Sequence, residues 1–460
     1  MKVLLATHFF PPGYAGGTEV YTYSLARGLR DQGHTVQVVC AHKWGEGEGY
    51  SVREEDDVYE GLPVKRLQLN WENAPDPFRY LYENPVMEEY FRAYLQEVQP
   101  DVLHITSCYS LSASIIHAAA DAGVPVVITL TDFWFLCPRH ILLRTDGTLC
   151  GGYAEEWQCL KCLLAGSRAY RTASSLLPEL PVSFLLKSMS RHPWFTRRRG
   201  LRGMAGDIGR RSKFLLETLG MADVIIAPCH FLRDMFVTRG VPTSAIIVSA
   251  YGMDTSAAQA GRQKTPSDRL RIGHIGQLEP IKGVDVLIEA FNQVKAGRSV
   301  ELRLHGDLNK NPAFVARLRF LAGDDPNIRF LGAFEKKDLG RVLSQIDVVA
   351  AASTWYENSP LAIYEAFAAG TPVIASDLGG MSEVVTPGVN GLLFAAGDAD
   401  GLAAALRRLL DEPGLLERLG SGVPGVKTVA EDVQDLCQVY TELVKVKAPW
   451  TRVPASPLLS

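Results

Sequence analysis

Residues 355–370 read WYENSPLAIYEAFAAG and carry two glutamates, Glu357 and Glu365, eight positions apart across the start of a helix. Pro360 suits the first helical position and Gly370 suits a left-handed exit. The sequence therefore predicts a helix over residues 360–369, which leaves Glu357 in the loop before it and Glu365 on its second turn.

The start of this predicted helix has the properties of an anion site. Asn358 or Ser359 is the expected cap, and the unpaired N–H groups of the first turn point toward an anion, with Glu357 at the mouth of the site. Glu365 follows Pro360 by roughly 7 Å along the axis, at 1.5 Å per residue. We expect a nucleoside diphosphate to span that gap.

This pattern resembles the retaining glycosyltransferases of the GT-B fold, family 4 type, whose E-x7-E motif matches Glu357 and Glu365. Residues 370–376, GTPVIAS, follow as a turn and a buried strand, which makes the resemblance specific. It implies an α/β fold of two doubly wound, Rossmann-like parallel-sheet domains facing a central cleft, with a C-terminal helix that crosses back. It also implies that Glu357 lies near the transferred sugar and Glu365 on the nucleotide ribose. Further donor contacts are then expected from Asn358, Ser359 and Leu361.

Length and composition are consistent with two or more domains. A chain of 460 residues exceeds the size at which one core keeps growing. The net charge of −4 provides no general attraction for nucleic acid. Residues 1–6 read as a first buried strand, since the apolar run stops at His8 without a cleavage site. No apolar stretch of about 20 residues occurs, so we expect a cytoplasmic protein.

Short apolar runs alternate with helical patterns along the whole chain, as doubly wound parallel sheets require. The expected domains are residues 1–253 for the acceptor, 269–426 for the nucleotide sugar, a crossing helix over 427–447 and a tail over 448–460, with a linker at 254–268. The predicted strands are 3–7, 35–40, 102–105, 124–130, 224–227 and 246–249 in the first domain, and 271–275, 300–305, 328–331, 348–352, 373–375 and 392–394 in the second.

The loop of residues 276–283, GQLEPIKG, follows the first strand of the second domain. Gly276 at its start lets the backbone approach an anion, and Lys282 supplies a positive charge. Lys282 matches the family's lysine on the diphosphate, whereas Gln277 stands where an arginine is usual. The resemblance implies that Lys282 stabilises the departing diphosphate, so that no catalytic metal is needed.

A second glycine-rich loop follows the first strand of the chain. Gly16 and Gly17 permit close approach of a ligand or form a tight turn, and Thr18 is the expected cap of the helix that follows. The family's Gly-Gly-x-Glu motif matches Gly16, Gly17 and Glu19.

Strand 127–130 leads into Thr131 and Asp132. Many relatives have histidine in place of Thr131, where it touches the donor sugar, so that contact falls here to Thr131 or to Asp132. We take Asp132 as a catalytic candidate; the alternative is a loop or capping carboxylate.

Four cysteines lie within one short region in the pattern C-x12-C-x8-C-x2-C. Four thiols match a tetrahedral structural metal, and a disulfide framework is not expected in a reducing compartment. The sequence therefore predicts a structural zinc ion, with ordinary free thiols or an iron–sulfur cluster as alternatives. The predicted ligands are Cys137, Cys150, Cys159 and Cys162.

Residues 168–213 combine apolar positions around Phe184 and Leu185 with a cluster of arginines that includes Arg197, Arg198 and Arg199. Such a surface suits peripheral contact with anionic lipid at the inner membrane face, but a solvated basic face or an acceptor-binding surface are alternatives. Nucleic acid is not expected as a partner, because stacking aromatics are not interleaved with the arginines.

The sequence thus indicates a retaining, metal-independent, hexosyltransferase-like enzyme that moves a sugar from a nucleoside diphosphate sugar to a glycan or lipid-linked acceptor. One alternative is a sugar-nucleotide sensor or scaffold without transfer. Another is a sugar-nucleotide epimerase on the same architecture, for which the chain offers no candidate set of acid and base residues.

Overall fold

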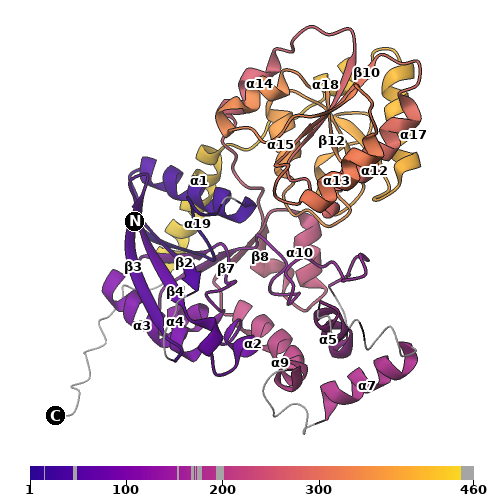
Figure 1. Ribbon diagram of the computed structural model, residues 1–460. Coiled ribbons are helices and arrows are strands. Elements are labelled where there is room, and N and C mark those ends of the chain that lie inside the picture. The colour runs from indigo at the N-terminus through magenta and orange to yellow at the C-terminus, as the bar shows by residue number, and fades with distance from the viewer. Residues whose placement is uncertain are drawn as a thin grey trace, which may run out of the picture. The chain divides into compact units, whose positions relative to one another are not determined.

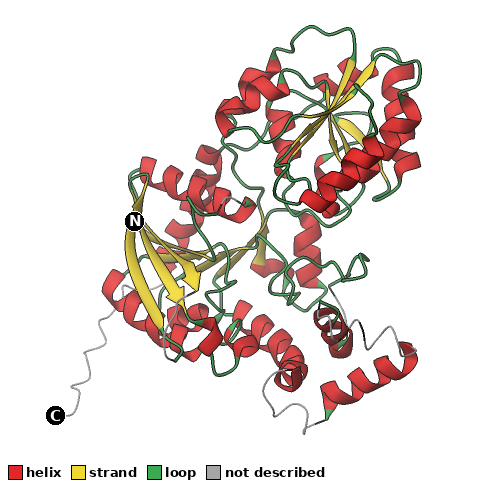
Figure 2. Ribbon diagram, viewed as in Figure 1, coloured by secondary structure: helices red, strands yellow, loops and turns green. Residues whose placement is uncertain are grey.

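The computed structural model describes residues 1–14, 16–44, 49–152, 155–166, 170, 172, 179–192 and 201–446. The chain forms two compact units, each built on its own sheet (Figure 1, Figure 2). The first unit contains Met1–Ala227, Met235–Val248 and Ala430–Ser460, and the second contains Pro228–Asp234 and Ser249–Val429.

The described part of the first unit holds an eight-stranded sheet in the order β3-β4-β2-β1-β5-β6-β7-β8. All neighbours pair in parallel except β3, which runs antiparallel to β4. The central strands are almost fully buried, as expected for a parallel sheet covered on both faces. The strands are β1 Lys2–Thr7, β2 Thr35–Trp44, β3 Val52–Tyr59, β4 Leu62–Leu69, β5 Val102–Ile105, β6 Val126–Thr129, β7 Val224–Ala227 and β8 Ile246–Val248.

Helices connect these strands, and the chain's last described helix packs with them. In that helix Tyr440 is fully buried and its hydroxyl lies 2.5 Å from Nδ1 of His104 in β5. The helices with their bounds are α1 Gly17–Asp31, α2 Pro77–Tyr80, α3 Pro85–Val98, α4 Ser114–Asp121, α5 Glu156–Leu164, α7 Glu179–Arg191, α9 Leu201–Leu219, α10 His230–Val237 and α19 Val429–Val446, with short 3-10 turns η1 Trp71–Asn73 and η2 Thr243–Ala245.

The second unit, described without gaps over residues 249–429, has a six-stranded, all-parallel sheet in the order β11-β10-β9-β12-β13-β14. Two separate apolar clusters pack on it, one with α12, α13 and α17 and the other with α14 and α15. The strands are β9 Leu270–Ile275, β10 Val300–His305, β11 Ile328–Phe330, β12 Val348–Ala351, β13 Val373–Ser376 and β14 Gly391–Phe394.

The helices of this unit lie around its sheet, as Figure 2 shows. They are α11 Ser256–Gln259, α12 Val284–Val294, α13 Pro312–Ala322, α14 Leu339–Leu343, α15 Leu361–Ala368, α16 Gly380–Val384, α17 Ala399–Asp411 and α18 Leu415–Ser421, with 3-10 turns η3 Ala260–Arg262, η4 Pro280–Lys282 and η5 Lys336–Asp338.

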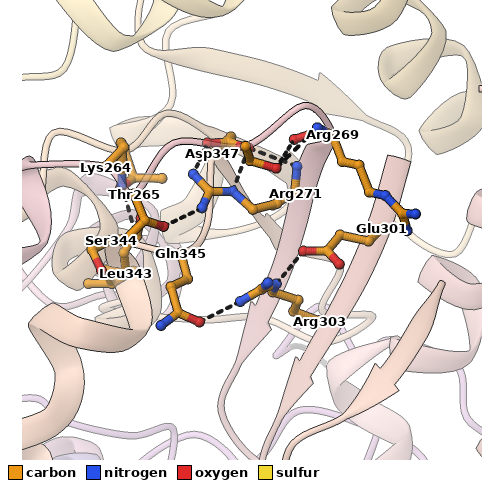
Figure 3. Close-up of polar contacts among 12 residues, drawn as sticks. Lys264, Thr265, Arg269, Arg271, Glu301, Arg303, Leu343, Ser344, Gln345 and Asp347 are labelled. Atoms are coloured by element: carbon orange, nitrogen blue, oxygen red, sulfur yellow. Dashed lines mark hydrogen bonds and ion pairs between the residues drawn. The ribbon is translucent and has the colours of Figure 1, made fainter. Parts of the chain in front are cut away.

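A buried ion pair fastens the amino ends of the two central strands β9 and β12 (Figure 3). Nη2 and Nε of Arg271 donate to Oδ1 and Oδ2 of Asp347 at 2.7 and 3.0 Å, and the backbone N–H of Arg271 donates to Oδ2 at 2.8 Å. The Arg271 side chain is only 4% exposed. Both carboxylate oxygens are thus engaged, which is the geometry that a buried charge pair requires.

All twelve predicted strands are present, with ends within two residues of the prediction except at β2, which continues to Trp44. The sequence prediction omitted β3 and β4. Lys65 and Arg66 interrupt the apolar pattern of β4, yet both are buried because they pair with Asp56 and Asp57 of β3 at 2.7 Å. Among the described residues, no helix has both the length and the apolar character needed to cross a bilayer.

Candidate active site

Two loops meet at the carboxyl edge of the second sheet, where ligands of doubly wound folds bind. The loop after β9 ends at Gly283, whose φ of 62° lies in the left-handed region. A Cβ on Gly283 would lie 2.0 Å from the carbonyl oxygen of Ala352, directly after β12. The N–H of Thr354 donates to the carbonyl of Ile281 at 2.9 Å. Main-chain contacts therefore hold the loop that carries Lys282 against the loop that carries Glu357.

Replacing Gly283 by alanine is expected to lower the melting temperature, because the new Cβ overlaps the Ala352 carbonyl. Gly297→Ala is the matched control: Gly297 also has a positive φ, 69°, but a Cβ there would have no neighbour within 4 Å. Both variants bear the left-handed penalty of about 1–2 kcal/mol. Equal melting temperatures for the two variants would contradict the close contact at Gly283.

The Glu357 carboxylate is the centre of a polar cluster that also contains Lys282, Ser353 and Trp355. Its Oε1 accepts from Nζ of Lys282 at 2.5 Å, from Oγ of Ser353 at 2.9 Å and from Nε1 of Trp355 at 3.1 Å. The Lys282 and Glu357 side chains are 23% and 15% exposed. Lys282 Nζ also lies 5.6 Å from the centre of the Trp355 ring. The two predicted catalytic residues of this unit are therefore in direct contact and partly open to solvent.

Helix α15 begins next to this cluster, but the predicted caps are wrong. Its N-cap is Pro360, with no side-chain capping hydrogen bond, and the N–H groups of Ile363 and Tyr364 both bond the Pro360 carbonyl. Asn358 is 9% exposed and Ser359 is half-buried, both in the loop before the helix. Leu361 is the first helical residue. Gly370 has the predicted left-handed conformation, with a φ of 64°.

Glu365 lies on the second turn of α15 and is half-buried. Burial raises its pKa to about 7, and the nearby Lys336 ammonium opposes this shift. A carboxylate held in such surroundings changes its charge near neutral pH, which is common at functional sites.

The remaining predicted donor residues are solvent-accessible. Gly276, with a φ of 143°, and Gln277 are both exposed at the start of the loop after β9.

Further along, Asp398 and Asp400 have the spacing of an Asp-x-Asp metal motif. Asp398 instead caps α17, where Oδ1 accepts from the N–H groups of Asp400 and Gly401 at 3.1 and 3.0 Å.

The first unit places Gly16 and Glu19 beside His8, which directly follows β1. Glu19 Oε1 lies 3.2 Å from Nε2 of His8, and a Cβ on Gly16 would lie 2.6 Å from Glu19 Oε2. Gly16 is the N-cap of α1 and Gly17 is its first residue, so the prediction of Thr18 as the cap is wrong. Burial opposes the ionised form of Glu19, but hydrogen bonding and charge from His8 outweigh it, and its pKa is lowered.

Asp132 lies just after β6 in the same unit. Its Oδ1 accepts from the N–H of Trp134 at 2.8 Å, as a loop-capping carboxylate does. Burial raises its pKa, while the imidazoles of His8 and His140 act in the opposite direction. Thr131 donates its hydroxyl to the carbonyl of Thr106 at 2.7 Å. Asp132 thus both caps the turn and faces titratable side chains.

Comparison with known families gives a direct assignment. Residues 269–412 match the family described as glycosyl transferases group 1, and residues 16–176 match a glycosyl transferase 4-like domain. The two matches together cover well over half of the chain. The chain is a group 1 glycosyltransferase.

Relatives of this glycosyltransferase extend over nearly its whole length. It is 26% identical to an MMP alpha-(1->4)-mannosyltransferase of Mycolicibacterium hassiacum, over 88% of this chain and 89% of the relative. It is 29% identical to a glycogen synthase of Mycobacterium tuberculosis, over 91% of this chain and 88% of the relative.

Solved structures place the glycosyltransferase in the GT-B fold. A sucrose-phosphate synthase from Thermosynechococcus elongatus superposes with a TM-score of 0.64 at 20% identity, over 97% of this chain and 99% of that structure. HepE from Anabaena, in complex with UDP, superposes with a TM-score of 0.62 at 19% identity, over 96% of this chain and all of that structure. The predicted fold class is confirmed.

The predicted zinc site of the glycosyltransferase is not supported. Cys137, Cys150, Cys159 and Cys162 are unpaired thiols in one region, where burial and the other three thiols raise the pKa of Cys159 to about 12. Nevertheless, within the described ranges no group of three or more His, Cys, Asp or Glu side chains lies close enough to hold a metal ion. Arg139 donates to Sγ of Cys162 at 3.5 Å. Spacing along the chain correctly grouped the thiols but did not bring them to coordination distance.

The basic segment of the glycosyltransferase is covered only in part. Arg197, Arg198 and Arg199 lie outside the described residues. On α7, Phe184 and Leu185 are 77% and 54% exposed. Contact with a membrane remains a prediction.

Sequence reasoning placed Ser353 and Trp355 in the loop that lines the site without giving their contacts, and it missed His8. Ser353 and Trp355 lie within the motif region, but their convergence on Glu357 depends on side-chain direction, which spacing does not give. His8 had a readable signal, since a polar residue directly after a buried parallel strand lies at the ligand-binding edge of the sheet.

Proposed function

We propose that this glycosyltransferase is retaining and metal-independent, and that it transfers a hexose from a nucleoside diphosphate sugar to a glycan or lipid-linked acceptor. The observation that carries the proposal is the Lys282–Glu357 pair, 2.5 Å apart, beside the start of α15. Related structures that contain UDP or ADP support a nucleotide donor. The mannosyltransferase and glycogen synthase relatives support a saccharide acceptor.

The roles of these residues follow from their charge and position. The first N–H groups of α15 and the Lys282 ammonium favour the diphosphate, whose negative charge grows as the sugar leaves. Glu357 already accepts three hydrogen bonds, and sugar hydroxyls can replace some of those donors. Glu365, farther along the same helix, is placed for the ribose hydroxyls. Metal independence rests on the positive charge of Lys282 at the leaving group.

Retention requires no protein nucleophile in this proposal. The acceptor hydroxyl attacks the anomeric carbon on the face that the diphosphate leaves, and its proton passes to the departing phosphate oxygen. The new C–O bond forms as the bond to phosphate breaks, and the diphosphate departs with the electron pair.

The proposal is tested by incubating the protein with a panel of nucleotide sugars and saccharide acceptors, with and without EDTA, and following the products by mass spectrometry and anomeric NMR. We expect release of nucleoside diphosphate, an acceptor product of unchanged anomeric configuration and no effect of EDTA. Nucleotide binding without turnover would favour a sensor. Conversion of one nucleotide sugar into an isomer, without release of diphosphate, would identify an epimerase.

Nucleotide affinity is expected to rise with pH through about 7, because Glu365 must be ionised to accept from both ribose hydroxyls and its pKa is raised to about 7. Below about pH 7, each unit by which the pH rises should lower the dissociation constant by up to about tenfold. Calorimetric titration with UDP, ADP and GDP from about pH 5.5 to about pH 8.5 measures this dependence. Glu365→Gln should flatten the profile, and an unchanged profile in that variant would assign the pH dependence elsewhere.

The ionisation of Glu365 is expected to affect folding stability in the opposite direction from nucleotide affinity. The folded state holds a proton on Glu365 over a range above the ordinary pKa of 4.5, where the unfolded chain has lost it. Its stabilising contribution is therefore complete below about pH 4.5 and is lost as the pH rises through about 7.

A further inference from the structure

Residues 230–234, at the start of helix α10, belong to the second unit, where a glutamate of α16 holds them. Oε2 of Glu383 accepts from the backbone N–H of His230 at 2.8 Å, and Oε1 accepts from the N–H of Phe231. Nδ1 of His230 also lies 3.1 Å from Oε2. One carboxylate therefore binds two of the N–H groups that the first turn of a helix leaves without intrahelical partners.

The first turn of α10 also lies against the loop that carries Glu357. The ring centres of Phe231 and Tyr356 are 4.9 Å apart, with an angle of 33° between the ring planes. Aromatic rings at such a distance attract one another. Tyr356 directly precedes Glu357 in the chain, so the Phe231 ring restrains the main chain next to the catalytic candidate.

The main chain at the start of α16 holds the Glu357 residue directly. The N–H of Gly380 donates to the carbonyl of Glu357 at 2.7 Å. Gly379 has a φ of 58°, and a Cβ there would lie 3.1 Å from the same carbonyl oxygen and 3.5 Å from Cε1 of Phe231. The main chain at Gly379 thus lies close to both Glu357 and the Phe231 ring, and α16, the start of α10 and the Glu357 loop are packed together.

We propose that Glu383 is a positioning residue for sugar transfer, which fixes the Phe231 ring and through it the Glu357 carboxylate. This assignment rests on the proposed function, in which Glu357 binds the transferred sugar. Both oxygens of Glu383 already accept hydrogen bonds and its side chain is 26% exposed, so it acts through the loop and not on the substrate. A displacement of about 1 Å at a reacting group is enough to slow an enzyme by about 10²-fold.

Replacing Glu383 by alanine should lower kcat by about 10- to 100-fold and leave the donor KM within about threefold of wild type. The donor keeps Lys282 and Glu365, which bind the diphosphate and the ribose in the proposed function. Phe231→Ala should give the same split between kcat and KM, whereas Phe231→Tyr, which keeps the ring, should retain kcat. The Phe231 variants leave the helix cap intact, so they carry the test even if Glu383→Ala does not fold.

The indole N–H of Trp355 provides a readout that needs no turnover, because it donates to Oε1 of Glu357 at 3.1 Å. Its ¹H–¹⁵N NMR signal, assigned with Trp355→Phe, should shift in Glu383→Ala and in Phe231→Ala. The Trp157 indole of the first unit, which donates to Glu155 at 2.6 Å, is the reference and should not shift.

Asp398→Ala is the matched control, because Asp398 accepts from two N–H groups at the start of α17, which packs in the other apolar cluster of this unit. It should lower the melting temperature to a degree similar to Glu383→Ala, since each change removes a helix cap. It should leave kcat and the Trp355 signal unchanged.

Wild-type kcat and an unshifted Trp355 signal in Glu383→Ala and Phe231→Ala would overturn the positioning role and reduce Glu383 to a helix cap. An equal loss of kcat in Asp398→Ala would overturn it too, because the loss of any cap would then have this effect. Failure of the proposed function is a separate result: the wild-type protein would release no nucleoside diphosphate from any donor, whatever the Trp355 signal does in the variants.

Discussion

Replacing Lys282 by alanine is expected to slow sugar transfer by about 10²- to 10³-fold, the usual effect of removing one preorganised group that stabilises developing charge. The ammonium lies 2.5 Å from Glu357 and is 23% exposed, so a diphosphate can reach it. The loss should appear mainly in kcat, because charge on the leaving diphosphate grows in the transition state. The melting temperature should change little. Steady-state kinetics with the donor identified in the nucleotide-sugar screen, together with thermal unfolding, measure both effects.

Lys295→Ala is the matched control. That lysine lies in the same unit and pairs with Asp325 at 2.6 Å, away from the carboxyl-edge loops. It should leave kcat within about twofold of wild type, since it neither touches nor orients the donor loops. If Lys282→Ala retained wild-type kcat with an unchanged fold, Lys282 would have no part in leaving-group stabilisation.

Replacing Asp347 by alanine is expected to destabilise the second unit by about 3–5 kcal/mol, because the change leaves the Arg271 guanidinium buried without its counter-charge. Arg271 is 4% exposed and Asp347 is 17% exposed, so solvent does little to compensate. Loss of the Asp347 carboxylate should also loosen the pairing of β9 and β12 at their amino ends, which this ion pair holds together (Figure 3). Hydrogen exchange of the β9 and β12 amides follows the second unit by itself, which is needed because a two-unit chain need not unfold in one step.

Asp411→Ala provides the comparison. Asp411 also accepts from an arginine, Arg298, at 2.6 Å, but the two side chains are 49% and 46% exposed. An exposed pair contributes about 0–1 kcal/mol, so exchange in β9 and β12 should stay near wild type. Similar effects of the two aspartate variants would mean that burial does not determine the importance of the Arg271–Asp347 pair.

The sheets were largely predictable because each buried parallel strand leaves a short apolar run, and the order of such runs fixes a doubly wound pattern. The prediction failed where charge was buried. Lys65 in β4 is 7% exposed. A lysine in a sequence indicates a surface position, and its burial becomes understandable only from its pairing with the β3 carboxylates. Pairing between strands, unlike the apolar pattern within one, is not encoded locally.

The sequence predicted which loops form the candidate site, but it did not predict which side chains are in contact there. Spacing and the family pattern placed Lys282 and Glu357 in one cluster, as the structure shows, but their ion pair depends on side-chain conformations that packing determines. The helix caps were missed for a related reason. Thr18 has the preferred chemistry for a cap, yet it is the second residue of α1, because the N-cap lies two residues earlier, at Gly16.

The burial of Tyr440 sets an order for biosynthesis. Its hydroxyl meets His104 at 2.5 Å, and with Val433 and Leu436 it supplies core to the unit that starts at Met1. That unit is therefore incomplete on the ribosome until residues beyond 429 have emerged, whereas the second unit has its whole sequence by then. Domains usually complete folding from the N-terminus during synthesis. In this chain the later-made unit has its whole sequence before α19 can complete the core of the first-made unit.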